Sequence, residues 1–96
     1  MSAAEAFSGG AAVVTGAGSG IGEGIARQAA SLGMQVVLAD ITLDRAERVA
    51  EDIRAGGGQA IAVHTDVRDP SALDRLADRA YQEFGDVRLL VNNAGI

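Results

Sequence analysis

Near its start the chain reads Val13-Val14-Thr15-Gly16-Ala17-Gly18-Ser19-Gly20-Ile21-Gly22, and this glycine-rich stretch decides the fold. An apolar run at residues 11–14 leads into the glycines, and an amphipathic pattern begins at Ile21. A strand that breaks on glycines and restarts as a helix leaves backbone N–H groups free at the helix N-terminus, where the helix dipole adds partial positive charge. The stretch therefore predicts a cradle for a phosphate or pyrophosphate.

Apolar runs and helical patterns alternate along the rest of the chain. Short apolar runs predict buried strands at residues 11–14, 36–39, 60–63 and 87–91. Helical spacing predicts a first helix from Ile21 to Gly33, a second after a Thr42 N-cap, and a third that begins at Asp69-Pro70. The expected apolar faces of these helices comprise Ile21, Ile25, Ala29 and Leu32; Ala46, Val49, Ala50 and Ile53; and Leu73, Leu76, Ala77, Ala80 and Phe84.

The alternation of strands and helices predicts an α/β fold with a doubly wound parallel sheet. Right-handed crossovers give four strands in the order 3-2-1-4 with three covering helices. The strand order then reverses between the first and fourth strands, so the glycine turn and residues 92–95 meet at the carboxyl edge, where such sheets bind ligands. The 96 residues make a single, incomplete domain, with residues 1–8 as a loose tail.

Charge and composition exclude several classes of function. The net charge of −5 argues against a nucleic-acid partner or an anionic membrane surface. With no cysteine and one histidine, His64, we expect no metal site and no thiolate chemistry. No apolar run approaches the ~20 residues that span a bilayer, and residues 1–10 carry no basic residue of a targeting signal. We therefore expect a cytoplasmic protein with no membrane partner.

The glycine turn matches the pattern G-x-x-x-G-x-G through Gly16, Gly20 and Gly22. Gly16 would allow the sharp turn out of the strand, and Gly20 would let the backbone approach a pyrophosphate closely. Gly22 would let the helix pack tightly on the strand. The alternative interpretation is a glycine-rich loop that binds no ligand.

An acidic residue, Asp40, ends the second predicted strand, eighteen positions after Gly22. In a dinucleotide site an acid at this spacing accepts hydrogen bonds from the adenosine ribose diol and repels a 2′-phosphate. The turn holds no arginine or lysine and Ile41 follows Asp40, so we expect nothing nearby to neutralise that phosphate. NAD is therefore favoured over NADP. The alternative is a solvated loop acid or a helix cap.

Polar residues also end the third and fourth predicted strands. Asp66 and Val67 suit an adenine, with a carboxylate near the exocyclic amine and an apolar side chain against the ring. The adjacent Asn92 and Asn93 can hydrogen-bond neighbouring strand ends and a ribose together. A loop aspartate and an ordinary turn are the simpler interpretations of these two motifs.

Taken together, these motifs resemble the short-chain dehydrogenase/reductase family. The resemblance covers about residues 8–96, and it rests on Thr15-Gly16-Ala17-Gly18-Ser19-Gly20-Ile21-Gly22, Asp40, Asp66-Val67 and Asn92-Asn93-Ala94-Gly95. It implies an NAD(P)(H)-dependent oxidoreductase with a Rossmann core that moves a hydride between the cofactor and an alcohol or ketone. The family also implies a homo-oligomer.

The resemblance assigns the cofactor-binding residues position by position. The pyrophosphate would be lined by Gly16, Ser19, Gly20, Ile21 and Gly22. The adenosine ribose would bind Asp40, the adenine would bind Asp66 and Val67, and the cofactor's ribose region would lie against Asn93. Asn92 would instead brace the sheet.

The chain departs from the family in its catalytic residues. Members carry a serine and a Tyr-x-x-x-Lys pair well downstream, but the one tyrosine here, Tyr81, has Gly85 where the lysine would be, and the chain contains no lysine. No residue is therefore assigned a catalytic role, and we expect the chain to match the first part of a family member and to be inactive alone.

Two alternatives remain open. One is a non-catalytic module that binds a nucleotide or associates through its unfinished sheet, because the strand at residues 87–91 is too apolar for an exposed edge. The other is a nucleotide-dependent methyltransferase, against which the Asn-Asn-Ala-Gly motif argues.

Overall fold

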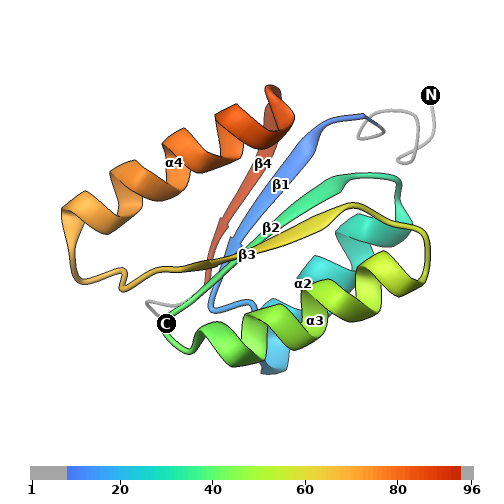
Figure 1. The fold of residues 1–96 in the computed structure, drawn as a ribbon, viewed down its shortest axis with the longest axis horizontal. Coiled ribbons are helices and arrows are strands. Elements are labelled where there is room, and N and C mark those ends of the chain that lie inside the picture. Colours follow the sequence, from blue (N-terminus) through green and yellow to red (C-terminus); the bar gives the residue numbers. More distant parts are fainter. Residues whose placement is uncertain (1–8, 94–96) are drawn as a thin grey trace.

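A four-stranded parallel sheet forms the centre of the computed structural model, which describes residues 9–93. The strands are β1 (Ala11–Thr15), β2 (Gln35–Asp40), β3 (Ala60–His64) and β4 (Val87–Asn92). Their order in the sheet is β3-β2-β1-β4, with every neighbouring pair parallel, which confirms the predicted topology (Figure 1). Each strand extends past its predicted apolar run to a polar residue at its carboxyl end, because backbone pairing continues there.

Three helices cover the sheet: α2 (Gly20–Ser31), α3 (Leu43–Ala55) and α4 (Pro70–Phe84). Helices α2 and α3 lie on one face and α4 lies on the other (Figure 1). Asp69 caps α4 as predicted, since its carboxylate accepts the N–H of Ser71 at 3.0 Å. Thr42 occupies the predicted N-cap position of α3, but its hydroxyl makes no capping hydrogen bond within the described residues. Asp40 Oδ1 instead accepts the Thr42 N–H at 2.8 Å.

Two apolar layers form the core, one on each face of the sheet. Successive strand residues point to opposite faces, so Val14 and Leu38 pack under α2 and α3 while Val13 and Val37 pack under α4. Leu38 is the largest of the completely buried side chains.

The predicted apolar faces of α2 and α4 are partly wrong. Ile21 is 75% exposed, and the buried positions of α2 are Gly22, Ala26 and Ala29. In α4 the buried positions are Ala72, Leu76 and Ala80, whereas Leu73 and Ala77 are exposed. The buried residues that the predicted faces omit, Gly22, Ala26 and Ala72, are all small, and a search for large apolar side chains at helical spacing does not detect them. Ala29, Leu76 and Ala80 are buried as predicted. The predicted face of α3 is confirmed.

One apolar region remains open beside β4. Leu90 is 68% exposed, and together with Tyr81 it borders a groove of about 290 Å³ between α4 and the sheet. The groove is lined by Val13, Thr15, Leu73, Leu76, Ala77, Ala80, Tyr81, Val87, Leu90 and Asn92. On its outer side, β4 has no partner strand within residues 9–93.

Replacing Leu38 by alanine should lower the free energy of unfolding by about 2–5 kcal/mol, because the fully buried side chain leaves a cavity under α2 and α3. Chemical denaturation followed by circular dichroism measures the change. Ile21→Ala serves as the control and should change stability by no more than about 0.5 kcal/mol, since its side chain is in solvent. Equal losses in the two variants would contradict the assignment of these faces.

Candidate functional site

A cleft opens where the carboxyl ends of the strands meet. The sheet register pairs Thr15 with Asn92 and Asp40 with His64, so all four strands end at one edge. The cleft has a volume of about 380 Å³ and is lined by Gly16, Ser19, Asp40, Ile41, Thr42, Arg45, Thr65, Asp66, Val67, Arg68 and Asn93. It therefore unites six of the predicted site residues, namely Gly16, Ser19, Asp40, Asp66, Val67 and Asn93.

Two glycines of the turn hold backbone conformations that suit no other residue well. Gly16 has φ of +65° and Gly20 has φ of +58°, both in the left-handed region. Gly16 sits where β1 leaves the sheet, which matches its predicted role in the sharp turn. A Cβ on Gly20 would meet nothing within 4 Å, so its conformation rather than its packing requires glycine.

Gly22 brings the start of α2 against the end of β1. A Cβ at this position would collide with the carbonyl oxygen of Gly16 and would lie 2.9 Å from Asn93 Nδ2. The absence of a side chain therefore lets the helix N-terminus lie across the strand end, as the glycine pattern predicted. Gly20, Ile21 and Gly22 belong to this turn but do not line the cleft itself.

The N-terminus of α2 offers unpaired backbone donors. Glu23 is the first residue of this region whose N–H reaches back to the turn, bonding to the carbonyl of Ser19 at 3.3 Å. The N–H groups of Gly20, Ile21 and Gly22 find no backbone acceptor within residues 9–93. Free N–H groups at the positive end of a helix dipole bind anions, so this turn fits a pyrophosphate.

Asp40 is buried, with 9% of its surface exposed, and it connects two segments. Its Oδ2 accepts the N–H of Gly18 at 2.9 Å, and its Oδ1 accepts the N–H of Thr42 at 2.8 Å. Gly18 was not among the predicted site residues. A Cβ there would lie 2.8 Å from Asp40 Oδ2 and 2.5 Å from Arg45 Cβ, so this position also needs glycine. The sequence signal that could have identified Gly18 is its place within the glycine-rich run.

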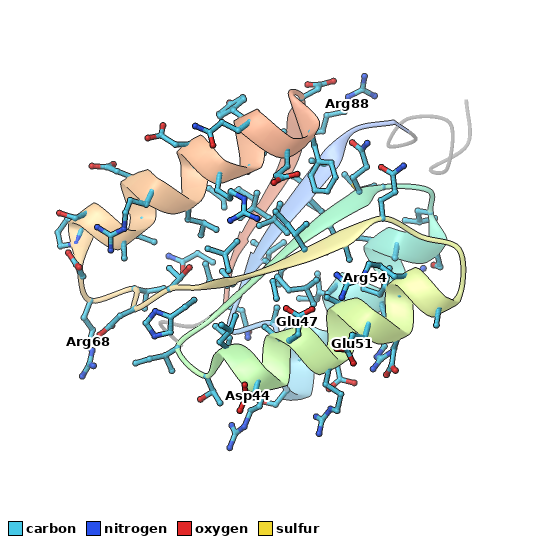
Figure 2. The ribbon with its side chains drawn as sticks, in the orientation of Figure 1. Asp44, Glu47, Glu51, Arg54, Arg68 and Arg88 are labelled. Atoms are coloured by element: carbon cyan, nitrogen blue, oxygen red, sulfur yellow. The ribbon has the colours of Figure 1, made fainter. Side chains whose placement is uncertain are left out.

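Asp66 forms a two-pronged ion pair with Arg68. Nε and Nη2 of Arg68 donate to Oδ1 and Oδ2 of Asp66 at 3.0 and 2.9 Å, and the Arg68 backbone N–H also donates to Oδ1 at 3.0 Å. These side-chain bonds, followed by the backbone bond, lower the pKa of Asp66 to about 2, and they raise the pKa of Arg68. Arg68 projects from the carboxyl end of the sheet, opposite the end that carries Arg88 (Figure 2).

The expectation that nothing near Asp40 could neutralise a phosphate is wrong. Arg45 and Arg68 both line the cleft. Arg45 lies five positions after Asp40, and the first turn of α3 returns it to the cleft. Within the described residues Arg45 pairs with no carboxylate. Arg45 is absent from the sequence prediction because it is neither in the turn nor next to Asp40 in the chain.

Thr15 joins the ends of β1 and β4. Its hydroxyl donates to Asn92 Oδ1 at 3.0 Å and accepts the N–H of Asn93 at 3.0 Å. Asn92 therefore braces the sheet, as expected, and Asn93 continues into the cleft lining. Ala94 and Gly95, the rest of this predicted motif, lie outside the described residues.

Residues 9–93 contain no group of three or more His, Cys, Asp or Glu side chains placed to hold a metal ion. None of the helices in this part of the chain is long and apolar enough to cross a membrane. Tyr81 lies in the apolar groove of α4, away from the cleft.

Comparison with known proteins gives consistent matches. A sequence model of the short chain dehydrogenase family matches residues 10–96. The chain is 45% identical to the 1-deoxy-11-beta-hydroxypentalenate dehydrogenase of Streptomyces exfoliatus, over 90% of this chain and 31% of that protein. It thus spans about a third of the length of this curated relative.

Solved structures share the fold. A short chain dehydrogenase/reductase from Burkholderia phymatum in complex with NAD matches with a TM-score of 0.85 and 46% identity, over 88% of this chain and 30% of that one. A metagenomic short-chain oxidoreductase in complex with NADP matches with a TM-score of 0.87 and 40% identity, over 94% of this chain and 41% of that one. Similar proteins therefore bind either dinucleotide.

Asp66 should titrate with a pKa of about 2, and Arg68→Gln should return that pKa toward the ordinary 3.8. Because the carboxylate has the lower pKa in the folded chain, its pair with Arg68 stabilises the fold fully above pH 3.8, and this contribution disappears as the pH falls through about 2. Carbon-13 NMR of the side-chain carboxyl measures the titration.

Arg75→Gln is the matched control, since Arg75 pairs with Asp69 at 3.8 Å and not with Asp66. It should leave the Asp66 pKa unchanged. An Asp66 pKa that responds equally to both substitutions would show that general charge, and not this pair, sets it.

Proposed function

The chain belongs to the short-chain dehydrogenase family, and we propose that it provides the dinucleotide-binding part of an NAD-dependent oxidoreductase acting on a small-molecule alcohol or ketone. The observation that carries the proposal is the cleft in which the glycine turn, with its free N–H groups, and the carboxylate of Asp40 lie together. The proposal takes the compartment to be the cytoplasm and the protein to be a homo-oligomer.

In this proposal the turn holds the pyrophosphate. The backbone donors of Gly20, Ile21 and Gly22 point out of the start of α2, and Ser19 and Gly16 line the cleft beside them. The two phosphate groups are negatively charged, and the partial positive charge at a helix N-terminus attracts them. Ile21 contributes its N–H rather than its side chain, which is in solvent.

Four other cleft residues are proposed to bind the adenosine and the cofactor's ribose region. Asp40 accepts hydrogen bonds from the adenosine ribose with the lone pairs that its two backbone donors leave free. Asp66 and Val67 bind the adenine, and Asn93 lies at the ribose region nearer β4. When bound, the nicotinamide supplies the hydride acceptor or donor.

The proposed preference is for NAD over NADP, although Asp40 and Arg45 act on a 2′-phosphate with opposite sign. The other arginine of the cleft, Arg68, is already paired with Asp66. Asp40 is buried, whereas Arg45 is exposed at the start of α3. A buried charge interacts more strongly than an exposed one, because water screens it less. The repulsion by Asp40 should therefore exceed the attraction by Arg45.

No residue of this chain receives a catalytic role in the proposal. Tyr81 borders the apolar groove of α4 and does not line the cleft. The 96 residues contain no lysine to lower the pKa of a tyrosine. The chain by itself is proposed to bind the cofactor without turning over an alcohol.

The apolar groove between α4 and β4 supports a second role, as an association surface. Leu90 and Tyr81 are exposed along it, and β4 has no neighbouring strand on its outer side within residues 9–93. We take a second copy of the chain as the occupant, because pairing two β4 edges would bury both copies of Leu90 and satisfy the open backbone groups of both strands.

Gly22→Ala should lower the affinity for NAD by about tenfold or more, equivalent to about 1.4 kcal/mol. The added Cβ would collide with the Gly16 carbonyl and push the donors of α2 away from the turn. Isothermal titration calorimetry with NAD measures the loss, and NADP titrated in parallel should bind about tenfold more weakly than NAD to the unmodified chain.

Gly24→Ala is the matched control on the same helix, where a Cβ meets nothing within 4 Å. It should keep the NAD affinity and stabilise α2 by about 0.5–1 kcal/mol. Equal affinities of the two variants would contradict the proposed pyrophosphate site, whereas equal affinities for NAD and NADP would contradict only the cofactor preference.

Sedimentation velocity should show concentration-dependent self-association of the chain, and Leu90→Lys should shift it to monomer because a buried charge at the paired edge is unfavourable. Leu43→Lys, at an exposed apolar residue of α3 away from the groove, should leave the association unchanged. A monomer at all concentrations would exclude this surface as a self-association site.

A further inference from the structure

We propose that Asp40 is a positioning residue for the glycine turn as well as the acceptor of the adenosine ribose. The inference rests on the proposed function, in that the turn is taken to bind the pyrophosphate. Its basis is one carboxylate whose two oxygens accept backbone N–H groups from two different segments, Gly18 of the turn and Thr42 before α3.

The turn has few side chains with which to hold its own shape. Four of residues 16–22 are glycine, and two of these, Gly16 and Gly20, hold positive φ values. Glycine has more conformational freedom than any other residue, so contacts from outside must order such a turn. Asp40 is the one side chain found to accept a hydrogen bond from the turn's backbone within residues 9–93.

Close packing reinforces this hydrogen bond. Gly18 is buried so tightly that a Cβ would lie 2.8 Å from Asp40 Oδ2 and 2.5 Å from Arg45 Cβ. The neighbouring Ala17 N–H bonds to the carbonyl of Ala39 at 3.1 Å, which ties the same part of the turn to the end of β2. A buried N–H that loses its acceptor is unfavourable, so removing the carboxylate should displace Gly18.

The consequence is a coupling between the two halves of the cofactor site. The donors at Gly20 to Gly22 follow directly after the segment that Asp40 holds. A turn released from Asp40 would therefore present these donors less accurately. Asp40 would affect phosphate binding even for a ligand that has no ribose.

Inorganic pyrophosphate is the probe that separates this role from ribose binding, because it has no hydroxyl for Asp40 to accept. Asp40→Ala removes a negative charge from the cleft together with both oxygens that accept the Gly18 and Thr42 N–H groups. By Coulomb attraction alone, the loss of this charge should strengthen the binding of an anion. If Asp40 positions the turn, the substitution should instead weaken pyrophosphate binding by about fivefold or more. Binding is followed through the NMR shifts of the Gly20 and Ile21 amides.

Asp44→Ala is the matched control, since it removes the same charge from the first turn of α3, next to the cleft residues Thr42 and Arg45, without removing a hydrogen bond to the turn. It should leave pyrophosphate affinity unchanged or raise it. Gly18→Ala is the second variant, because it keeps the charge and places a Cβ against Asp40. It should weaken pyrophosphate binding as Asp40→Ala does. An affinity of Asp40→Ala equal to or above that of Asp44→Ala would overturn the inference.

Amide hydrogen exchange on the chain without ligand tests the positioning role separately from the proposed function. In Asp40→Ala the protection of the Ala17 amide should fall about tenfold or more, whereas Val14, inside β1, should keep its protection and report an intact sheet. Unchanged protection at Ala17 would overturn the positioning role. Loss of protection there, in a chain that binds neither pyrophosphate nor NAD, would support the positioning role and refute the proposed function.

Discussion

The close approach of α2 to the end of β1 is the constraint on which the rest of the structure depends. Gly22 lies against the carbonyl of Gly16 with no room for a Cβ, so the helix begins directly over the strand end. This contact orients the helix N-terminus toward the cleft. It also seats α2 through Gly22, Ala26 and Ala29, which places the large Ile21 side chain in solvent. The same small residues thus set the position of the helix N-terminus and decide how the first layer packs.

Hydrogen bonds from both sides hold that turn in place. Asp40 reaches it from β2 through the Gly18 N–H, and Thr15 links the strand before it to Asn92 and Asn93 on β4. The strands concerned, β2, β1 and β4, are neighbours in the sheet. At the switch point, polar groups at neighbouring strand ends therefore stabilise one another. These hydrogen bonds join protein groups only and do not depend on a ligand.

Charge around the cleft is balanced rather than uniformly acidic. The chain carries a net charge of −5, yet two arginines, Arg45 and Arg68, line the cleft beside Asp40 and Asp66. Arg68 already occupies the Asp66 carboxylate through two side-chain hydrogen bonds. An adenine amine that binds Asp66 must therefore share it with Arg68. The net charge of a chain is a poor guide to the charge that a ligand meets in one cleft.

By itself the sequence determined the strand order, the sheet edge at which the cleft lies, and the strand-end positions of Asp40 and Asn92, because each follows from local patterns and from the rules of parallel sheets. The prediction that Asp66 ends the third strand is wrong, since β3 ends at His64 and Asp66 follows two residues later. Only the tertiary structure decided that Ala26 and Ala72 face the sheet. It also decided that Gly18 is held by Asp40 and that Arg45 returns to the cleft. These depend on how closely two backbones approach and on which side chains meet across segments separated in the chain. Such distances arise from packing and have no local signature in the sequence.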